Sequence, residues 1–304
     1  METKSVFLTI AGRANAGKSS LLNLLIGEKI AMVTDKPQTT RTKITGVLTK
    51  EELQYVFIDT PGIHKAHNKL GEHMNKVVKD SVTGIDAVVY MADVTKKINQ
   101  IDIDAIESLK RSNTPVILVL NKIDLVNDKN EVAVKIAEFS QLMDFRSVIP
   151  ISVAENDGVD ILMNEITELA VPAPHYFPDD SFTDQPEKVI MSEMIREKAM
   201  LLMHDEIPHG IAVIIETLDE SVTKSGEDIL NISAVIYCER DSHKGMVIGK
   251  GGTMLRKIGQ SAREELEDFF RIRVNLQLWV KVKEDWRNRE GLIRNFGLNA
   301  PTDK

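Results

Sequence analysis

The sequence predicts an α/β domain with a mostly parallel sheet and helices on both faces, followed by a smaller α+β domain. In the first part of the chain, short apolar runs alternate with longer segments of helical pattern, which is typical of parallel strands joined by crossover helices. These apolar runs cover residues 6–10, 55–58, 87–92, 116–120 and 147–151. Ligands of such sheets bind beyond the carboxyl ends of the strands, so we expect functional residues directly after each run.

A proline-rich segment separates the two domains. Pro172 is the first of four closely spaced prolines that end at Pro186. Neither a helix interior nor a sheet interior tolerates such a run, because proline lacks an amide N–H. We therefore predict a first domain, a linker, a second domain and a C-terminal tail over residues 1–171, 172–188, 189–290 and 291–304.

Composition indicates a globular protein of a reducing compartment. The chain has 304 residues, of which 42% are hydrophobic and 28% charged, as in ordinary globular domains with buried cores. Its only cysteine, Cys238, has no disulfide partner within the chain, and we expect it to be buried as a small apolar residue. Since the first strand begins close to Met1, we predict no signal or transit peptide and a cytoplasmic location.

Charge is unevenly distributed along the chain. The formal net charge is −8, but residues 240–294 hold 13 Lys and Arg against 8 Asp and Glu, so this segment carries +5 and the remainder −13. One basic segment in an acidic chain favours an anionic partner at that part of the protein.

Residues 12–19 form a phosphate-binding signature. Gly12-Arg13-Ala14-Asn15-Ala16-Gly17-Lys18-Ser19 fits G-x-x-x-x-G-K-[ST] and lies between a strand-like run and a helical segment, which is the context that the motif requires. The glycines let backbone N–H groups face a triphosphate, Lys18 supplies charge for the outer phosphates, and Ser19 supplies a hydroxyl ligand for Mg²⁺. Ser20, the next residue, is included among the predicted nucleotide contacts.

A second phosphate-site segment, Asp59-Thr60-Pro61-Gly62, follows the run at residues 55–58 and fits D-x-x-G. The Asp59 carboxylate can hold a water molecule of Mg²⁺, and the Gly62 N–H can approach the γ-phosphate because glycine has no side chain. Ser19, Asp59 and one threonine described below are the predicted metal ligands.

A third segment, Asn121-Lys122-Ile123-Asp124, decides the base. Guanine presents two neighbouring N–H donors that the Asp124 carboxylate can accept as a pair, whereas adenine presents an acceptor at the ring nitrogen. A site built on such polar pairing discriminates by about 10⁴ or more. Ser152-Val153-Ala154, after the last apolar run, is predicted to support the base.

The polar segment at residues 36–42 is placed to cover the γ-phosphate. We predict that Thr40, with Thr39 as the alternative, completes the coordination of Mg²⁺ only while the third phosphate is present, so that hydrolysis releases the segment. A solvated loop without this role is the competing interpretation.

Slow intrinsic hydrolysis is expected, because residue 63 is isoleucine and cannot orient a water molecule through a hydrogen bond. We hypothesise that Asn15 gives an oxygen ligand to K⁺, which would bridge the phosphates and neutralise charge in the transition state. The predicted catalytic residues are therefore Lys18, Thr40, Gly62 and Asn15.

The second domain has the predicted order helix, strand, strand, short helix, glycine loop, helix, strand. Helical spacing covers residues 189–204, strand patterns cover 211–216 and 230–238, and alternation covers 274–282. This order is similar to that of K-homology (KH) domains, in which a G-x-x-G loop clamps single-stranded RNA.

The candidate RNA contact is Gly249-Lys250-Gly251-Gly252. Its glycines let phosphates approach the backbone, and lysine adds counter-charge. The flanking residues that we predict to contact RNA are Lys244, Ile248, Arg256 and Lys257.

Taken together, the motifs resemble those of the Era family of bacterial GTPases with a C-terminal KH domain. The likeness includes Pro37-Gln38-Thr39-Thr40-Arg41 and Ile248-Gly249-Lys250-Gly251-Gly252 and runs nearly end to end. It implies GTP and GDP as ligands, binding of 16S ribosomal RNA near its 3′ end, a role in small-subunit assembly, and loose peripheral association with the inner membrane.

Three functions stay open on the sequence alone. The first is a GTP hydrolase whose nucleotide state gates RNA binding, and the second is an RNA-binding assembly factor that uses GTP mainly as a structural ligand. The third is a small-molecule kinase, against which Asp124 and the second domain argue. RNA affinity measured in the GTP and GDP states separates the first two.

Overall fold

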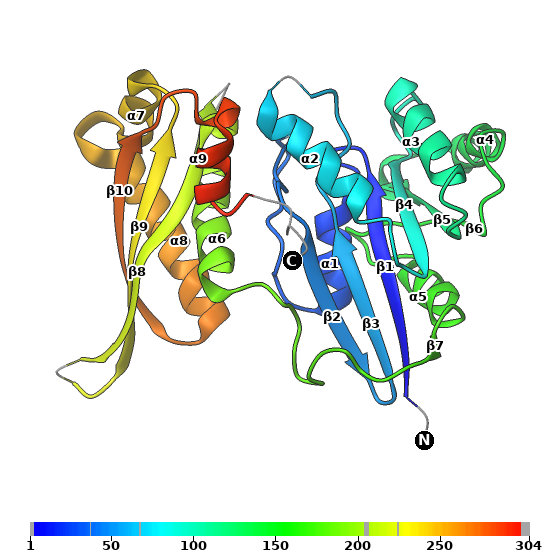
Figure 1. Ribbon diagram of the computed structural model, residues 1–304, viewed down its shortest axis with the longest axis horizontal. Helices are drawn as coiled ribbons and strands as arrows, with labels where there is room; N and C mark the ends of the chain where they lie inside the picture. Colours follow the sequence, from blue (N-terminus) through cyan, green and yellow to red (C-terminus); the bar gives the residue numbers. More distant parts are fainter. Residues whose placement is uncertain (1–2, 37, 67, 204–206, 224, 299–304) are drawn as a thin grey trace. The chain divides into compact units, whose positions relative to one another are not determined.

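The computed structural model describes residues 3–36, 38–66, 68–203, 207–223 and 225–298, and the chain divides into two compact units (Figure 1). The first unit comprises Met1–Ala31, Thr40–His67 and Gly71–Asp184. The second comprises Met32–Thr39, Asn68–Leu70 and Gln185–Lys304. Most of the loop that follows the first helix is thus grouped by its contacts with the second unit.

The first unit is built on a mostly parallel sheet, as the sequence predicts. The strand order is β2-β3-β1-β4-β5-β6, and a short β7 pairs with β1. The parallel strands are β1 (Lys4–Gly12), β3 (Leu53–Asp59), β4 (Ala87–Asp93), β5 (Val116–Asn121) and β6 (Ser147–Pro150).

Two strands of this sheet were not expected. β2 (Ile44–Lys50) runs antiparallel to β3 along its whole length, and the polar Thr45 and Thr49 interrupt the apolar pattern that would have predicted it. β7 (Val171–Pro172) pairs antiparallel with Lys4 and Ser5. Such a two-residue edge pairing accommodates a proline.

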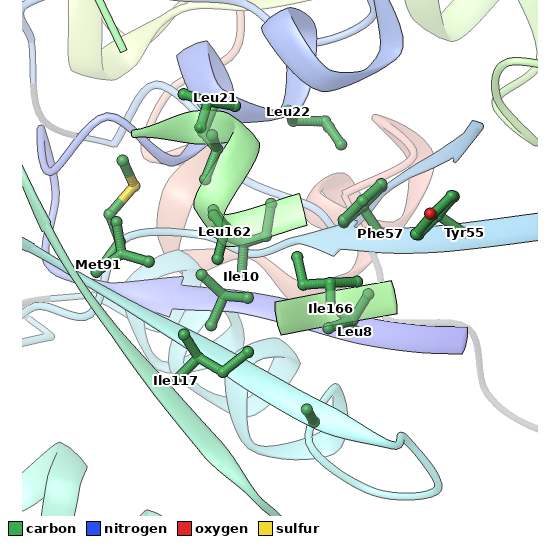
Figure 2. Close-up of a cluster of buried hydrophobic side chains, with 14 of the residues drawn as sticks. Leu8, Ile10, Leu21, Leu22, Tyr55, Phe57, Met91, Ile117, Leu162 and Ile166 are labelled. Carbon is green, nitrogen blue, oxygen red and sulfur yellow. The ribbon is translucent and has the colours of Figure 1, made fainter. Parts of the chain in front are cut away.

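Helices cover both faces of the sheet, which confirms the predicted architecture. On one face, α1 (Lys18–Ile26) and α5 (Val159–Thr167) pack on the strands through Leu21, Leu22, Leu162 and Ile166 (Figure 2). Residues from α3 (Gln100–Lys110) and α4 (Lys129–Ser140) join strand residues such as Tyr90 in a second cluster. The strands read as continuous apolar runs because both faces are buried.

The second unit has the predicted KH order. After α6 (Glu187–Leu202) come β8 (Ala212–Val222), β9 (Asp228–Cys238), α7 (Asp241–Ile248), the 3₁₀ turn η3 (Lys250–Gly252), α8 (Thr253–Phe270) and β10 (Arg273–Val282). The sheet order is β10-β9-β8, with β10 parallel and β8 antiparallel to β9. The last residue of the predicted first helix, His204, lies outside the described residues.

The core of the second unit lies between its sheet and helices α6 and α8, and Cys238 belongs to it. Burial raises the pKa of the Cys238 thiol to about 12. The thiol is therefore protonated and packs as a small apolar side chain, as the sequence predicts. None of the helices in the described ranges is both long enough and apolar enough to cross a bilayer.

Part of the predicted tail is folded onto the second unit. A 3₁₀ turn, η4 (Trp286–Asn288), precedes α9 (Glu290–Asn295). The buried Trp286 donates its indole N–H to the carbonyl of Gly210 over 2.9 Å, and Phe296 stacks on Tyr237 with ring centroids 4.9 Å apart. The end of the tail, residues 299–304, lies outside the described part of the chain.

Candidate functional site

The phosphate-binding loop has a shape that requires glycine at both ends. Gly12 and Gly17 have φ values of 143° and 102°, in the region that glycine alone visits easily. A Cβ at Gly12 would lie 2.1 Å from the carbonyl oxygen of Met91, and one at Gly17 would lie 2.3 Å from Nδ2 of Asn121. Strand β1 and helix α1 therefore meet across a loop that leaves no space for side chains at these positions.

Lys18 is buried at the base of this loop. Its side-chain nitrogen donates a hydrogen bond to the carbonyl of Arg13 over 3.0 Å, so the lysine side chain extends back across the loop. Burial lowers the pKa of Lys18, and the nearby Asp59 carboxylate opposes this shift. The ammonium group thus lies at the loop that the sequence predicts to bind phosphate.

Three oxygen ligands converge beside Lys18. The Ser19 hydroxyl donates to Oδ2 of Asp59 over 2.6 Å, and its oxygen lies 2.9 Å from the Thr40 hydroxyl. Asp59 Oδ1 is buried and has no hydrogen-bond partner within the described residues. Burial raises the pKa of Asp59 to about 6, with Lys18 opposing the rise.

This oxygen set fits Mg²⁺, which prefers carboxylate and hydroxyl oxygens. Thr40 is buried, which favours the predicted metal role over a solvated loop. Thr39 instead pairs with Thr34 over 2.7 Å and donates to the Lys36 carbonyl over 2.6 Å. Pro37, in the same segment, lies outside the described residues.

The guanine-specificity segment is tied to the phosphate loop by Asn121. Its side chain donates to the carbonyl of Ala16 over 2.9 Å and accepts from the backbone N–H of Val153 over 3.1 Å. The hydroxyl of Ser152 donates to Oδ1 of Asp124 over 2.6 Å. These bonds place the exposed Asp124 carboxylate in a fixed orientation next to the loop, and Ala154 follows in the same turn.

The D-x-x-G segment lies against the phosphate loop. A Cβ at Gly62 would lie 2.6 Å from the Cα of Ala14, so only glycine permits this approach. The Thr60 hydroxyl donates to the carbonyl of Ile10 over 2.9 Å. The buried Pro61 lies between Thr60 and Gly62 in the chain. Asp59, at the end of β3, and Gly62 are therefore both held at the loop by this four-residue segment.

The side chain of Arg13 connects the phosphate-binding loop to helix α3. Its guanidinium donates to Oδ2 of Asp102 over 3.1 Å, and Tyr90 donates its hydroxyl to Oδ1 of the same carboxylate over 3.0 Å. Asp102 also belongs to the capping box of α3 with Asn99. Sequence analysis missed Asp102, although the Asn99-x-x-Asp102 spacing could have indicated a capped helix.

Lys122 has a structural role, because its side chain forms an ion pair with a residue of the neighbouring strand. Its φ is 71°, and its ammonium group pairs with Oδ2 of Asp93 over 2.7 Å, at the end of the neighbouring strand β4. The pairing lowers the pKa of Asp93 although burial acts the other way. This ion pair links the last residue of β4 to the residue that follows β5.

The G-x-x-G loop of the second unit is open to solvent. Gly251 and Gly252 have φ values of 61° and 75°, and added Cβ atoms there would meet nothing within 4 Å, whereas one at Gly249 would lie 2.8 Å from the backbone of Met254. Helix α8 begins at Thr253 without a side-chain cap. Exposed lysine and arginine flank the loop at Lys250, Arg256 and Lys257, while Lys244 and Ile248 are half-buried.

Comparison with known proteins identifies both units. A family model for 50S ribosome-binding GTPases matches residues 7–122, and a KH domain model matches residues 206–287. GTPase Era of Clostridioides difficile strain 630 is 48% identical over 296 residues, which is 97% of this chain and 99% of that protein. GTPase Era of Ruminiclostridium cellulolyticum is 45% identical over 300 residues, with 99% of each chain covered.

Solved structures match over nearly the whole chain. One is an Aquifex aeolicus Era variant bound to GDP and aluminium fluoride, and another is Era in complex with MgGDPNP and nucleotides 1506–1542 of 16S ribosomal RNA. Each has a TM-score of 0.93 and 35% sequence identity, and covers 98% of this chain and 100% of its own.

Proposed function

The chain belongs to the family of Era GTPases, and from this premise we propose that it is a nucleotide-switched factor in assembly of the small ribosomal subunit. In this proposal it hydrolyses GTP at the loop site of the first unit, and its G-x-x-G loop grips 16S ribosomal RNA near the 3′ end. In this proposal residues 1–171 bind and hydrolyse GTP, residues 189–290 bind RNA, and residues 172–188 form the linker between them.

Specificity for guanine rests on the bond between Ser152 and Asp124, which is the single observation that supports the nucleotide assignment best. With one carboxylate oxygen engaged by Ser152 over 2.6 Å, Asp124 is oriented before the base arrives. Two guanine N–H groups can pair with this carboxylate, while adenine would set a ring acceptor against it. GTP is therefore preferred over ATP.

Hydrolysis is supported by the groups around Lys18. Backbone N–H groups of residues 13–20 and the Lys18 ammonium hold the phosphates, and Gly62 faces the γ-phosphate. Ser19, Thr40 and Asp59 would hold Mg²⁺, which when bound neutralises charge on the β- and γ-phosphates. Ile63 cannot orient water, so intrinsic turnover is slow.

RNA binding is supported by the open glycine loop and by the relative solved with RNA. The neighbour with a TM-score of 0.93 holds nucleotides 1506–1542 of 16S ribosomal RNA. Phosphates can reach the loop where Gly251 and Gly252 leave open space, and the surrounding cations supply counter-charge. The cytoplasm, with loose peripheral contact at the inner membrane, is the proposed location.

Calorimetry with GTP, GDP and ATP tests the nucleotide assignment directly. We expect GTP and GDP to bind in the presence of Mg²⁺ and ATP to bind at least about 10³-fold more weakly. Equal binding of ATP would overturn the assignment. RNA affinity that is the same in GDPNP and GDP would instead favour an assembly factor that uses GTP as a structural ligand.

A further inference from the structure

The peptide group between Gly62 and Ile63 is held at both of its polar ends. Its N–H, from Ile63, donates to the carbonyl of Gly12 over 3.1 Å. Its carbonyl, from Gly62, lies 2.8 Å from Nδ1 of His64. A carbonyl oxygen only accepts hydrogen bonds, so Nδ1 of His64 carries the proton and donates. This clamp fixes the plane of the peptide that directly follows Gly62.

His64 is in turn held by helix α2 (Lys69–Asp80). Nδ2 of Asn75, in the middle of that helix, donates to the backbone carbonyl of His64 over 3.0 Å. The remaining polar atoms of the two side chains, Nε2 of His64 and Oδ1 of Asn75, are buried without a hydrogen-bond partner in the described ranges. Buried acceptors without partners reduce stability, so this pair is poorly explained as a purely stabilising feature.

A cavity lies beside the clamp. Its volume is about 630 Å³, and its lining includes Ile63, His64 and Asn75 together with Val78 of α2 and Leu109 of α3. His64 therefore lies at the wall of this cavity, with one ring nitrogen buried and the other bonded to Gly62.

We propose that His64 and Asn75 are positioning residues for GTP hydrolysis. By fixing the peptide after Gly62, they limit the conformations open to Gly62 and so help to hold its N–H, which lies in the preceding peptide group and faces the γ-phosphate in the proposed function, on which this inference rests. Asn75 acts through His64, and His64 acts through Gly62. Neither side chain touches the nucleotide, and GDP lacks the phosphate that Gly62 faces.

The test compares wild type with His64→Ala, Asn75→Ala, the double variant of these two, and His64→Asn. We expect His64→Ala to lower kcat for GTP and affinity for GDPNP each about tenfold, as for loss of one oriented donor, while GDP affinity changes less than about twofold. Asn75→Ala lowers kcat in the same direction, and the double variant is no worse than His64→Ala because both act through one bond. His64→Asn, whose amide N–H can replace Nδ1, restores most of the turnover.

Controls keep the outcomes distinct. Lys65→Ala, at an exposed neighbour in the same segment, is expected to turn over GTP like wild type, and thermal unfolding confirms that each variant is folded. Wild-type turnover that persists unchanged in His64→Ala overturns the inference, as does an equal loss of GDP and GDPNP affinity, which indicates a merely structural role. Absence of turnover in wild type overturns the proposed function itself.

Discussion

Asp59 and Lys18 place opposite charges inside a site from which water is largely excluded. Both are buried, and burial is the largest influence on each: it raises the pKa of Asp59 to about 6 and lowers the pKa of Lys18. Their mutual attraction only partly offsets the cost of desolvation. The pair therefore reduces the stability of the nucleotide-free protein. Binding of nucleotide and metal would stabilise it.

Removal of the Asp59 charge should stabilise the nucleotide-free protein in a pH-dependent way. The unfolded carboxyl has a pKa of about 4, and the folded one titrates at about 6. As pH rises between these values the unfolded chain loses its proton first, so wild-type stability falls, and above about pH 6 the loss is complete. Asp59→Asn has no such loss.

Urea unfolding in EDTA checks this expectation. The stability gained by Asp59→Asn over wild type should grow by about 2 kcal/mol between about pH 4.5 and about pH 7.5. A gain that does not depend on pH would contradict the argument. The same variant should bind nucleotide without the Mg²⁺ dependence of wild type.

Asp124→Asn should exchange one base preference for another. The amide presents one donor and one acceptor, which suits xanthine, whose C2 carries a carbonyl, better than guanine. We expect GTP affinity to fall at least about 100-fold and xanthosine triphosphate affinity to rise. Fluorescence competition measures both, and Ser152→Ala is the matched control, because it frees the Asp124 oxygen but keeps the carboxylate.

Asn15 offers a test of the cation hypothesis at a single atom. Its φ of 63° lies in the left-handed region, so Asn15→Gly keeps the loop conformation while it removes the side-chain oxygen. If K⁺ is bound there, wild type should hydrolyse GTP about tenfold or more faster in K⁺ than in Na⁺. The variant should lose this difference. Equal wild-type rates in the two salts would remove the cation from the mechanism.

The sequence predicts the helices and strands that have a strong hydrophobic pattern. It does not predict elements that form only because they contact residues distant in the chain. The buried runs of β1, β4 and β5 are apolar because helices cover both faces. β2 contains two threonines and a glycine among its apolar residues, and it forms because it can pair with the edge of β3. No local pattern shows this pairing. Helix α9 likewise depends on long-range contacts, such as Phe296 with Tyr237.

Residues of the candidate site follow the same division. Motif spacing predicts Lys18, Asp59 and Asp124 as site residues, because each lies at or beyond the carboxyl end of a strand. Asp102 was not predicted, since its role depends on hydrogen bonds to Arg13 and Tyr90, which lie on other elements of the chain. Sequence patterns identify groups that contact ligand more readily than groups that hold those groups in place.

The start of α3 can be tested through Asp102. Asp102→Ala removes the partner of Arg13, leaves the Tyr90 hydroxyl unpaired and breaks the capping box, so we expect a loss of about 2 to 4 kcal/mol in unfolding free energy. GTP affinity should also fall, because the loop loses its anchor on α3. Tyr90→Phe is the milder control, and chemical denaturation measures both. A change under about 0.5 kcal/mol for Asp102→Ala would contradict the anchoring role.

At the scale of the whole molecule, the loop after α1 is shared between the two units. Met32–Thr39 is grouped with the second unit, and Thr40 with the first. In the second unit the buried Arg196 donates to the carbonyl of Thr39, and Glu197 accepts from the N–H of Val33 over 3.2 Å. The residue next in the chain, Thr40, lies at the oxygen cluster beside Ser19.

Chain continuity between Thr39 and Thr40 predicts that the nucleotide state affects RNA binding through Arg196. A ligand shifts an equilibrium only by its difference in affinity for the two states, so RNA affinity should differ about fivefold or more between GDPNP and GDP. Arg196→Met keeps an unbranched side chain of similar length but loses the guanidinium and its bond to Thr39, and should bring this ratio close to one. Gly252→Asp should instead weaken RNA binding in both states, because it places a carboxylate where phosphate approaches. Anisotropy with labelled RNA of the 16S 3′ end measures each ratio, and a ratio that Arg196→Met leaves unchanged would show that the signal takes another route.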